Sequence, residues 1–278
     1  MNLADTGKGL VRTIACQAAS HSGILTRMRE SRTAERGARI ALYHSIPRAD
    51  ALNFERQMVF LKRNYDIVPL PELIKAIESR NRGSRPLLAV TFDECFRDAY
   101  ANAVPALLRH GIPATFFAVC DFTDASKHGL QAVEAFCRER MYTRLVQPGM
   151  SWKQLRELKR QGFDIGSHTN SHAWCSKLAD EELHLELNGS RDRLSEELGC
   201  QIEHFAFPFG TERHVSEKAV AMARAAGYRS ACWARRGWNT FRTDPYHLRR
   251  DPLSPAWPLS VIEGMLCGLF DWWKPAVV

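Results

Sequence analysis

Two histidines and two adjacent acids are the side chains of this sequence whose types and spacing fit a metal site. His168 and His172 lie four residues apart, which predicts two imidazoles on one side of a helical turn. Asp93 and Glu94 follow an apolar run, so they leave a strand in different directions, and one can bind a cation while the other acts as a base. One carboxylate with two imidazoles is a common ligand set for a hydrolytic metal ion. Taken singly, either pair also fits ordinary solvated or core residues.

Two further strand ends supply groups for hydrolysis. His44 follows the apolar run 40–43, and an imidazole is suited to protonating a leaving amine near neutral pH. Phe209 and Gly210 follow the run 204–207 and can offer backbone N–H groups to an oxyanion. Together, the strand ends predict a hydrolytic metal site assembled from distant parts of the chain.

The elements that must position these residues alternate between strand and helix. Near-continuous apolar runs separated by helical patterns are typical of a parallel sheet covered by helices. The expected strands are 40–43, 66–70, 86–92, 114–119, 163–166, 204–207 and 230–233. The expected helices include 53–63, 72–79, 99–110, 180–198 and 216–226, and the looser stretch 121–149 is interpreted as an insertion. About seven such units predict an α/β barrel, whose active site lies at the carboxyl ends of the strands.

The flanks of this barrel suggest three regions. We expect a helical preamble over 1–37, the barrel over 38–258, and a C-terminal helix over 259–278 that docks on the barrel, with an interfacial helix as the alternative. The N-terminus does not resemble a secretory signal, and no run of about 18 apolar residues predicts a membrane span. The 8 cysteines form no CxxC pair. These features favour a cytoplasmic protein, with membrane association as a further option.

Positive charge gathers in two segments. Lys plus Arg minus Asp plus Glu is 38 − 31 = +7 for the 278 residues. Residues 1–39 contribute 7 − 3 = +4 and residues 224–251 contribute 7 − 2 = +5. Both segments fit contacts with a phosphate- or lipid-linked substrate or with an anionic membrane surface. No nucleic-acid-binding motif accompanies the charge, so nucleic acid is not an expected partner.

Three motifs in order resemble the polysaccharide deacetylases, the NodB-homology enzymes of carbohydrate esterase family four. They are Thr91-Phe-Asp-Glu94, Ser167-His-Thr-Asn-Ser-His172 and Phe205-Ala-Phe-Pro-Phe-Gly210. The resemblance implies a distorted (β/α) barrel and one divalent metal, commonly zinc, with nickel, cobalt or iron as alternatives. It also implies a hydrolase acting on linear amide bonds that removes N-acetyl groups from amino sugars.

The resemblance carries roles over to individual residues. Asp93 matches the general base, and Glu94, His168 and His172 match the metal ligands. Phe209 matches the residue whose backbone N–H holds the oxyanion. Leu42-Tyr-His44 resembles the circularly permuted branch, in which the first-strand histidine is the general acid, and His247 is the reserve candidate for that role.

Three positions depart from the family pattern. Glu94 stands where Asp is usual, Cys95 replaces the usual Gly and is a soft potential ligand, and Ala206 stands where many members have an arginine that orients the base. The predicted function is metal-dependent N-deacetylation of a carrier-linked amino sugar. The alternatives are an N-deformylase or other N-acyl amidase on a lipid- or nucleotide-linked sugar, and a non-catalytic glycan-binding relative.

Overall fold

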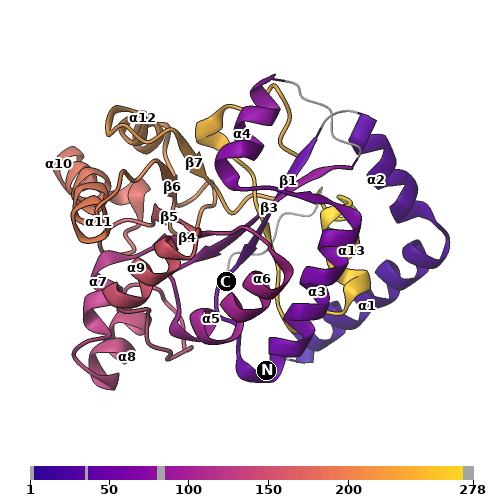
Figure 1. Ribbon diagram of the computed structural model, residues 1–278, viewed down its shortest axis with the longest axis horizontal. Coiled ribbons are helices and arrows are strands. Elements are labelled where there is room, and N and C mark those ends of the chain that lie inside the picture. Colours follow the sequence, from indigo (N-terminus) through magenta and orange to yellow (C-terminus); the bar gives the residue numbers. More distant parts are fainter. Residues whose placement is uncertain (1–2, 35–36, 80–84, 272–278) are drawn as a thin grey trace.

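A curled parallel sheet forms the centre of the computed structural model, which describes residues 3–34, 37–79 and 85–271 (Figure 1). The sheet order is β7-β6-β5-β4-β3-β1-β8, and β2 pairs with β3 off this path. The strands are β1 (Ala38–Tyr43), β2 (Asp66–Ile67), β3 (Leu87–Asp93), β4 (Thr115–Ala118), β5 (Asp164–Ser167), β6 (His204–Ala206), β7 (Ser230–Cys232) and β8 (Asp251–Pro252). The predicted distorted (β/α) barrel of about seven strands is therefore confirmed.

The segment 248–252 lies between β1 and β7 and connects the two ends of the curled sheet. On one side, Leu248 forms a parallel bridge with Cys232, and its carbonyl accepts the Trp233 N–H at 2.8 Å. On the other side, β8 pairs in parallel with β1, with Asp251 opposite Ala41. This closing segment comes late in the chain, and the sequence patterns did not identify it as a strand.

Helices surround the sheet because each has one apolar face to bury. In α3, for example, Phe54, Met58 and Leu61 recur at helical spacing and are buried. The helices that follow the strands and cover the sheet are α3 (Ala51–Asn64), α4 (Leu70–Ser79), α5 (Arg97–Asn102), α6 (Val104–His110), α7 (Cys120–Ala125), α8 (Leu130–Glu139), α9 (Trp152–Arg160), α10 (Asp180–His184), α11 (Ser190–Leu198) and α12 (Glu217–Ala225).

Several expected elements differ in the structure. The helix predicted over 99–110 is two helices, α5 and α6, because Pro105 has no N–H to continue the ladder. The helix predicted over 180–198 is interrupted by a π-helical turn at Leu185–Gly189. The looser stretch 121–149 contains most of α7 and all of α8 rather than irregular chain. The strand expected over 66–70 ends at Ile67.

Helices from the two ends of the chain pack on each other beside α3. They are α1 (Leu3–His21), α2 (Ile24–Ala34) and α13 (Leu259–Leu266). A Cβ on Gly264 would lie 2.5 Å from the Cys16 Sγ, so only glycine allows α1 to approach α13 this closely. Every residue of α13 from Val261 to Leu266 is buried, so this apolar surface is used inside the protein. The remainder of the expected C-terminal helix, 272–278, lies outside the described residues.

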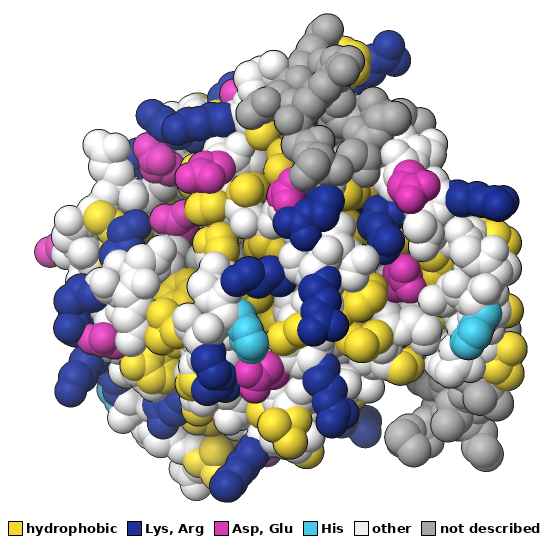
Figure 2. Space-filling model, turned by 45° about the vertical axis from the view of Figure 1, so that its right-hand side comes forward, with side chains coloured by type: hydrophobic (Ala, Val, Ile, Leu, Met, Phe, Trp, Pro, Cys, Tyr) yellow, Lys and Arg dark blue, Asp and Glu magenta, His cyan; other side chains and the backbone are white. Residues whose placement is uncertain are grey.

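All eight cysteines are free, and seven of them are buried. None of the helices in the described ranges has the length and apolar character needed to cross a bilayer. The face in Figure 2, which brings the side of α1, α2 and α3 forward, carries Lys and Arg side chains near its middle with a few acids among them.

Candidate metal centre

A left-handed turn at the end of β3 separates the two acids. Asp93 is the last residue of the strand, and Glu94 and Cys95 follow with φ angles of 59° and 55°. Two consecutive non-glycine residues in this region are strained, and the Cys95 N–H closes the turn on the Asp93 carbonyl at 2.8 Å. The strain is located where neighbouring carboxylates must point in different directions.

The two histidines belong to a loop and not to a helical turn, so the structural reason for their predicted convergence was wrong. His168 follows β5 directly, and Thr169 and His172 have φ angles of 68° and 58°. These left-handed residues curl the loop and bring the two rings to a centroid distance of 5.2 Å. Glu186 holds the loop in place, because its carboxylate accepts the Asn170 and Ser171 N–H groups at 2.8 and 3.0 Å.

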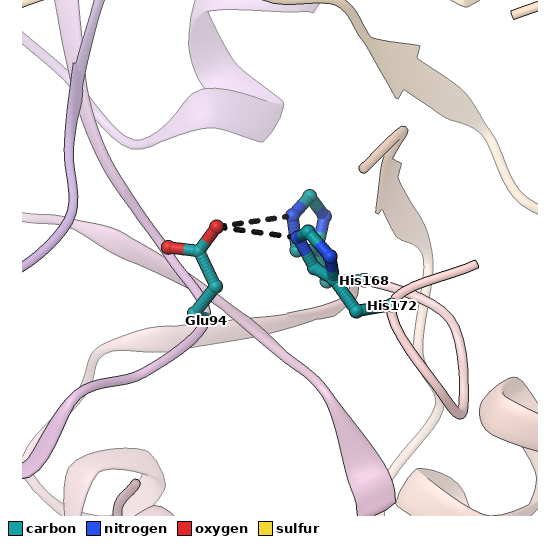
Figure 3. Close-up of side chains that lie close together, drawn as sticks. All are labelled: Glu94, His168 and His172. Atoms are coloured by element: carbon teal, nitrogen blue, oxygen red, sulfur yellow. Dashed lines mark ion pairs between the residues drawn. The ribbon is translucent and has the colours of Figure 1, made fainter. Parts of the chain in front are cut away.

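Glu94 and the two imidazoles converge on one point (Figure 3). The Oε1 of Glu94 lies 3.3 Å from the His172 Nε2 and 3.9 Å from the His168 Nε2. One ligand atom from each of the three residues lies within 4.8 Å of the others, and the residues described contain no second group of this kind. The structure therefore brings together the three residues predicted as metal ligands.

The chemistry of these atoms fits a divalent cation. The Nδ1 of His168 contacts the Ala206 carbonyl at 2.7 Å, and the Nδ1 of His172 contacts the Arg140 carbonyl at 3.2 Å. Because a carbonyl only accepts, each Nδ1 carries the proton and each Nε2 presents a lone pair toward Glu94. Both Nε2 atoms and the Glu94 Oε2 are buried without a hydrogen-bond partner. Buried acceptors facing one another are what a bound cation would satisfy.

Burial also sets the charge state of this group. Desolvation lowers the pKa of His168 to about 4, which leaves its imidazole neutral as a metal ligand must be. The thiol of Cys95 contributes no atom to the group and belongs to the buried apolar core. Burial raises the pKa of that thiol well above its usual range, so it stays protonated.

Asp93 is held by an arginine that sequence reasoning missed. The Nη1 and Nη2 of Arg250 donate to the two carboxylate oxygens of Asp93 at 2.6 and 2.7 Å. Burial opposes ionisation of Asp93, but Arg250 and nearby histidines outweigh it, so the pKa lies below the ordinary aspartate value. The carboxylate is thus ionised although Ala206 offers no charge. Arg250 lies in the basic segment 224–251, where a count of charges cannot distinguish buried from exposed arginines.

The two histidines proposed as general acid have different surroundings. His44 follows β1, its side chain is 43% exposed, and its Nε2 lies 3.7 Å from the Glu94 Oε2. His247, the reserve candidate, stacks on Trp233 at 5.3 Å and lies 3.3 Å from Glu217. Of the two, the structure brings only His44 to the cluster.

The Phe209 ring packs between His172 of the candidate metal site and two other aromatic rings, those of Tyr142 and His214. Its ring packs edge-on against His172 at 4.6 Å and tilts against His214 at 4.8 Å and Tyr142 at 5.8 Å. Its φ is 61°, and within the described chain its N–H has no hydrogen-bond acceptor. A Cβ on the next residue, Gly210, would lie 2.3 Å from the Ala234 nitrogen, so glycine is required for this turn.

A hollow of about 540 Å³ opens beside His172. Tyr142, 68% exposed, and Trp174 line it, and the Lys177 Nζ lies 3.7 Å over the Trp174 ring. Aromatic rings such as these, at the edge of a hollow, suit the apolar faces of sugar rings. Tyr142 and Trp174 carried no sequence signal, because single aromatics in loops have no periodicity.

The geometry agrees with comparisons to known proteins. The profile of the family described as polysaccharide deacetylase matches residues 80–231, more than half of the chain. The YxkH protein of Bacillus subtilis (strain 168), named after the polysaccharide deacetylases, is 23% identical over 222 residues, covering 78% of this chain and 71% of that protein.

Solved structures share the fold. The Streptococcus pyogenes deacetylase PplD in complex with acetate has a TM-score of 0.67 and 17% identity, covering 82% of this chain and 97% of that one. IcaB from Ammonifex degensii has a TM-score of 0.62 and 20% identity, covering 83% and 97%. The matched profile contains Asp93, Glu94, His168 and His172. The chain belongs to the polysaccharide deacetylase family and is a hydrolase of amide C–N bonds.

Proposed function

We propose that this protein removes the N-acetyl group from an amino sugar with the help of one divalent metal ion, zinc being favoured. The observation that carries this proposal is the convergence of the Glu94 Oε1 with the Nε2 atoms of His168 and His172, both of which are buried without a hydrogen-bond partner, beside an ionised carboxylate. A cation held by these residues supplies Lewis acidity for the acyl carbonyl and a water of lowered pKa.

The remaining steps belong to residues of the chain. Asp93, held by Arg250, accepts the proton of the attacking water. The Phe209 N–H donates to the oxygen on which negative charge develops, and His44 gives a proton to the departing amine. His44 comes from the first strand, outside the matched region 80–231, which supports placing this chain in the circularly permuted branch.

The substrate in this proposal is a glycan or glycan precursor attached to a phosphate- or lipid-bearing carrier. Support comes from the hollow beside His172, whose rings suit a neighbouring sugar. A peripheral contact with an anionic membrane surface and a cytoplasmic location complete the proposal. A formyl or other small acyl group in place of acetyl would be recognised by the same chemistry.

Metal content and product analysis test this proposal together. We expect one equivalent of divalent metal in the purified protein, and free acetate from a panel of N-acetylated, N-formylated and carrier-linked amino sugars. Glu94→Ala should lose the metal, whereas Glu139→Ala should keep it because that carboxylate is 65% exposed beside the hollow. Asp93→Asn should keep the metal but lose at least about a hundredfold in turnover. The matched control is Asp180→Asn, whose side chain is 78% exposed.

Two results would contradict the proposal. A fully folded protein that binds no divalent metal and releases no acyl group would indicate a glycan-binding relative without activity. Unchanged turnover in Asp93→Asn would remove that residue from its role as the base.

A further inference from the structure

The basic segment 224–251 contains arginines of two kinds. Four of its seven arginines are paired with carboxylates: Arg224 with Asp244, Arg229 with Glu203, Arg235 with Glu212, and Arg250 with Asp93. Within the described ranges, the other three, Arg236, Arg242 and Arg249, have no carboxylate within ion-pair distance. The arginines without a carboxylate partner therefore lie within residues 236–249 of the segment.

Two of these unpaired arginines line one hollow. Arg242 and Arg249 both border a cavity of about 570 Å³ that also includes Thr240 and Thr243. This hollow shares no lining residue with the one beside His172. It is therefore a second site, separate from the metal cluster.

The backbone of Arg249 is fixed by Asn239, and its side chain lies against Gly237. A Cβ on Gly237 would lie 2.8 Å from the Arg249 Nη1 and 3.0 Å from its Cδ, so the guanidinium side chain lies against bare backbone. Asn239 fixes the same stretch, because its Oδ1 accepts the Arg249 N–H at 2.8 Å and its Nδ2 donates to the Arg249 carbonyl at 2.9 Å. The position from which the Arg249 side chain extends into the hollow is therefore fixed.

The acids that border this hollow are already engaged. Asp244 pairs with Arg224 at 3.1 Å, and Asp271 pairs with Arg39 at 2.8 Å. Arg39 is shared with the buried Asp251, at 2.7 Å. The lining holds Arg235, Arg242 and Arg249 against these two acids, so its formal charge is 3 − 2 = +1. Positive charge with hydroxyl donors nearby selects an anion.

Aromatic rings give the hollow a second recognition element. Trp233 and His247 stack at 5.3 Å with an interplanar angle of 23°, and both border the cavity. Trp238 also lines it, and its indole Nε1–H is buried without an acceptor. These flat surfaces suit a sugar or base ring next to the anionic group.

We propose that this hollow binds a phosphate-bearing ligand, with Arg242 and Arg249 on the phosphate oxygens and the aromatic rings beside its organic part. Guanidinium groups match phosphate oxygens in bidentate geometry, and neither Arg242 nor Arg249 is paired with a carboxylate of the described residues. The phosphate can come from a soluble phosphorylated sugar or from a lipid headgroup. The site does not depend on the proposed hydrolysis.

Calorimetric titration of the whole protein with pyrophosphate, and co-sedimentation with phosphatidylglycerol vesicles, test this site. We expect binding of pyrophosphate, of the vesicles, or of both, and at least a tenfold loss in Arg242→Gln/Arg249→Gln. The matched control is Arg229→Gln in the same segment, which removes a charge already paired with Glu203. Pyrophosphate binding alone identifies a soluble ligand, and vesicle binding alone identifies a lipid.

A second variant guards against misfolding of the double variant. Arg249→Gln alone, with thermal unfolding as the check of its fold, should weaken binding while the Gly237 backbone at φ +137° stays unchanged. Equal binding by the double variant and the wild type, or no binding of either probe by the wild type, would overturn the proposal. Because the readout is binding, failure here leaves the proposed deacetylation untouched.

Discussion

Arg250 and Asp93, which are 157 residues apart in sequence, form a bidentate ion pair. Both side chains are inside the protein, with exposed fractions of 0% and 4%. The pair joins the closing segment of the barrel to the end of β3, next to the proposed metal ligand Glu94. Since both oxygens of Asp93 are engaged, the arginine fixes the orientation of the carboxylate as well as its charge.

Arg250→Lys should therefore reduce turnover without removing the metal. A lysine ammonium is a point charge that cannot hold both carboxylate oxygens, so we expect a fall in kcat of about tenfold or more. Arg250→Met should also destabilise the fold by about 3–5 kcal/mol, because it leaves a buried carboxylate unpaired. Metal content, kcat and urea unfolding separate these effects. Arg229→Lys is the control, and wild-type turnover in Arg250→Lys would dismiss the positioning role.

Gly210→Ala should disturb the turn that carries the Phe209 N–H. The new Cβ would meet the Ala234 backbone nitrogen at 2.3 Å, and backbone cannot move aside as a flexible side chain can. The control is Gly199→Ala, because Gly199 has a similar φ of +64° but no heavy atom within 4 Å of its Cβ position.

We expect Gly199→Ala to cost about 1 kcal/mol in stability with activity intact. Gly210→Ala should cost more stability and also lower kcat. Thermal unfolding and acyl-release assays distinguish the two variants. Equal effects in both would mean that the Gly210 contact does not position the turn.

Tyr142→Ala should weaken binding of oligosaccharides more than it slows the reaction. The ring is exposed and lies against Phe209, so its removal takes away a sugar-contacting surface and leaves the three proposed ligands in place. We expect KM for an oligosaccharide to rise severalfold with kcat changed less than twofold. Leu130→Ala, on the exposed surface of α8, is the control. An unchanged KM would show that the hollow does not contact the substrate.

Asp251 should make stability depend on pH. Burial raises its pKa to about 7, and the nearby Asp271 adds to this against the opposing charge of Arg39. The folded protein then holds a proton that the unfolded chain releases from about pH 4 upward. The contribution of Asp251 is thus complete below about pH 4 and is lost as pH rises to about 7.

Each pH unit of that window corresponds to at most about 1.4 kcal/mol. The measurement is the free energy of urea unfolding between pH 4 and pH 8 for wild type and for Asp251→Asn, whose amide cannot titrate. The wild type should lose stability relative to the variant as pH rises. Parallel pH profiles would show that Asp251 does not titrate in this range.

The sequence predicted the barrel and the metal cluster because both follow from local patterns. Apolar runs such as Leu88–Phe92 have the length and composition of buried parallel strands, and residues directly after them must share one edge of the sheet. This placed Asp93, Glu94, His168 and His172 at one edge without knowledge of the loop that joins the histidines, and the choice of Glu94 as the proposed ligand came from the family resemblance.

The parts that were missed depend on contacts far apart in sequence. Arg250 looked like one more surface arginine, since nothing local indicates that Asp93 lies opposite it. The left-handed conformations of Glu94, Cys95 and His172 also could not be predicted from the sequence. Non-glycine residues adopt them only when tertiary contacts compensate for the strain. Strand β8 has only two residues and contains a proline, so no apolar periodicity could reveal it.

The closing segment also sets when in biosynthesis the site is completed. The proposed metal ligands all precede residue 173, whereas the arginine that holds Asp93 and the backbone nitrogen that braces Gly210 lie between residues 234 and 250. A chain emerging from the ribosome can thus assemble the ligands before it can fix the base or the oxyanion turn. On the proposed mechanism, the base and the oxyanion turn therefore reach their working geometry only after the closing segment has been synthesised.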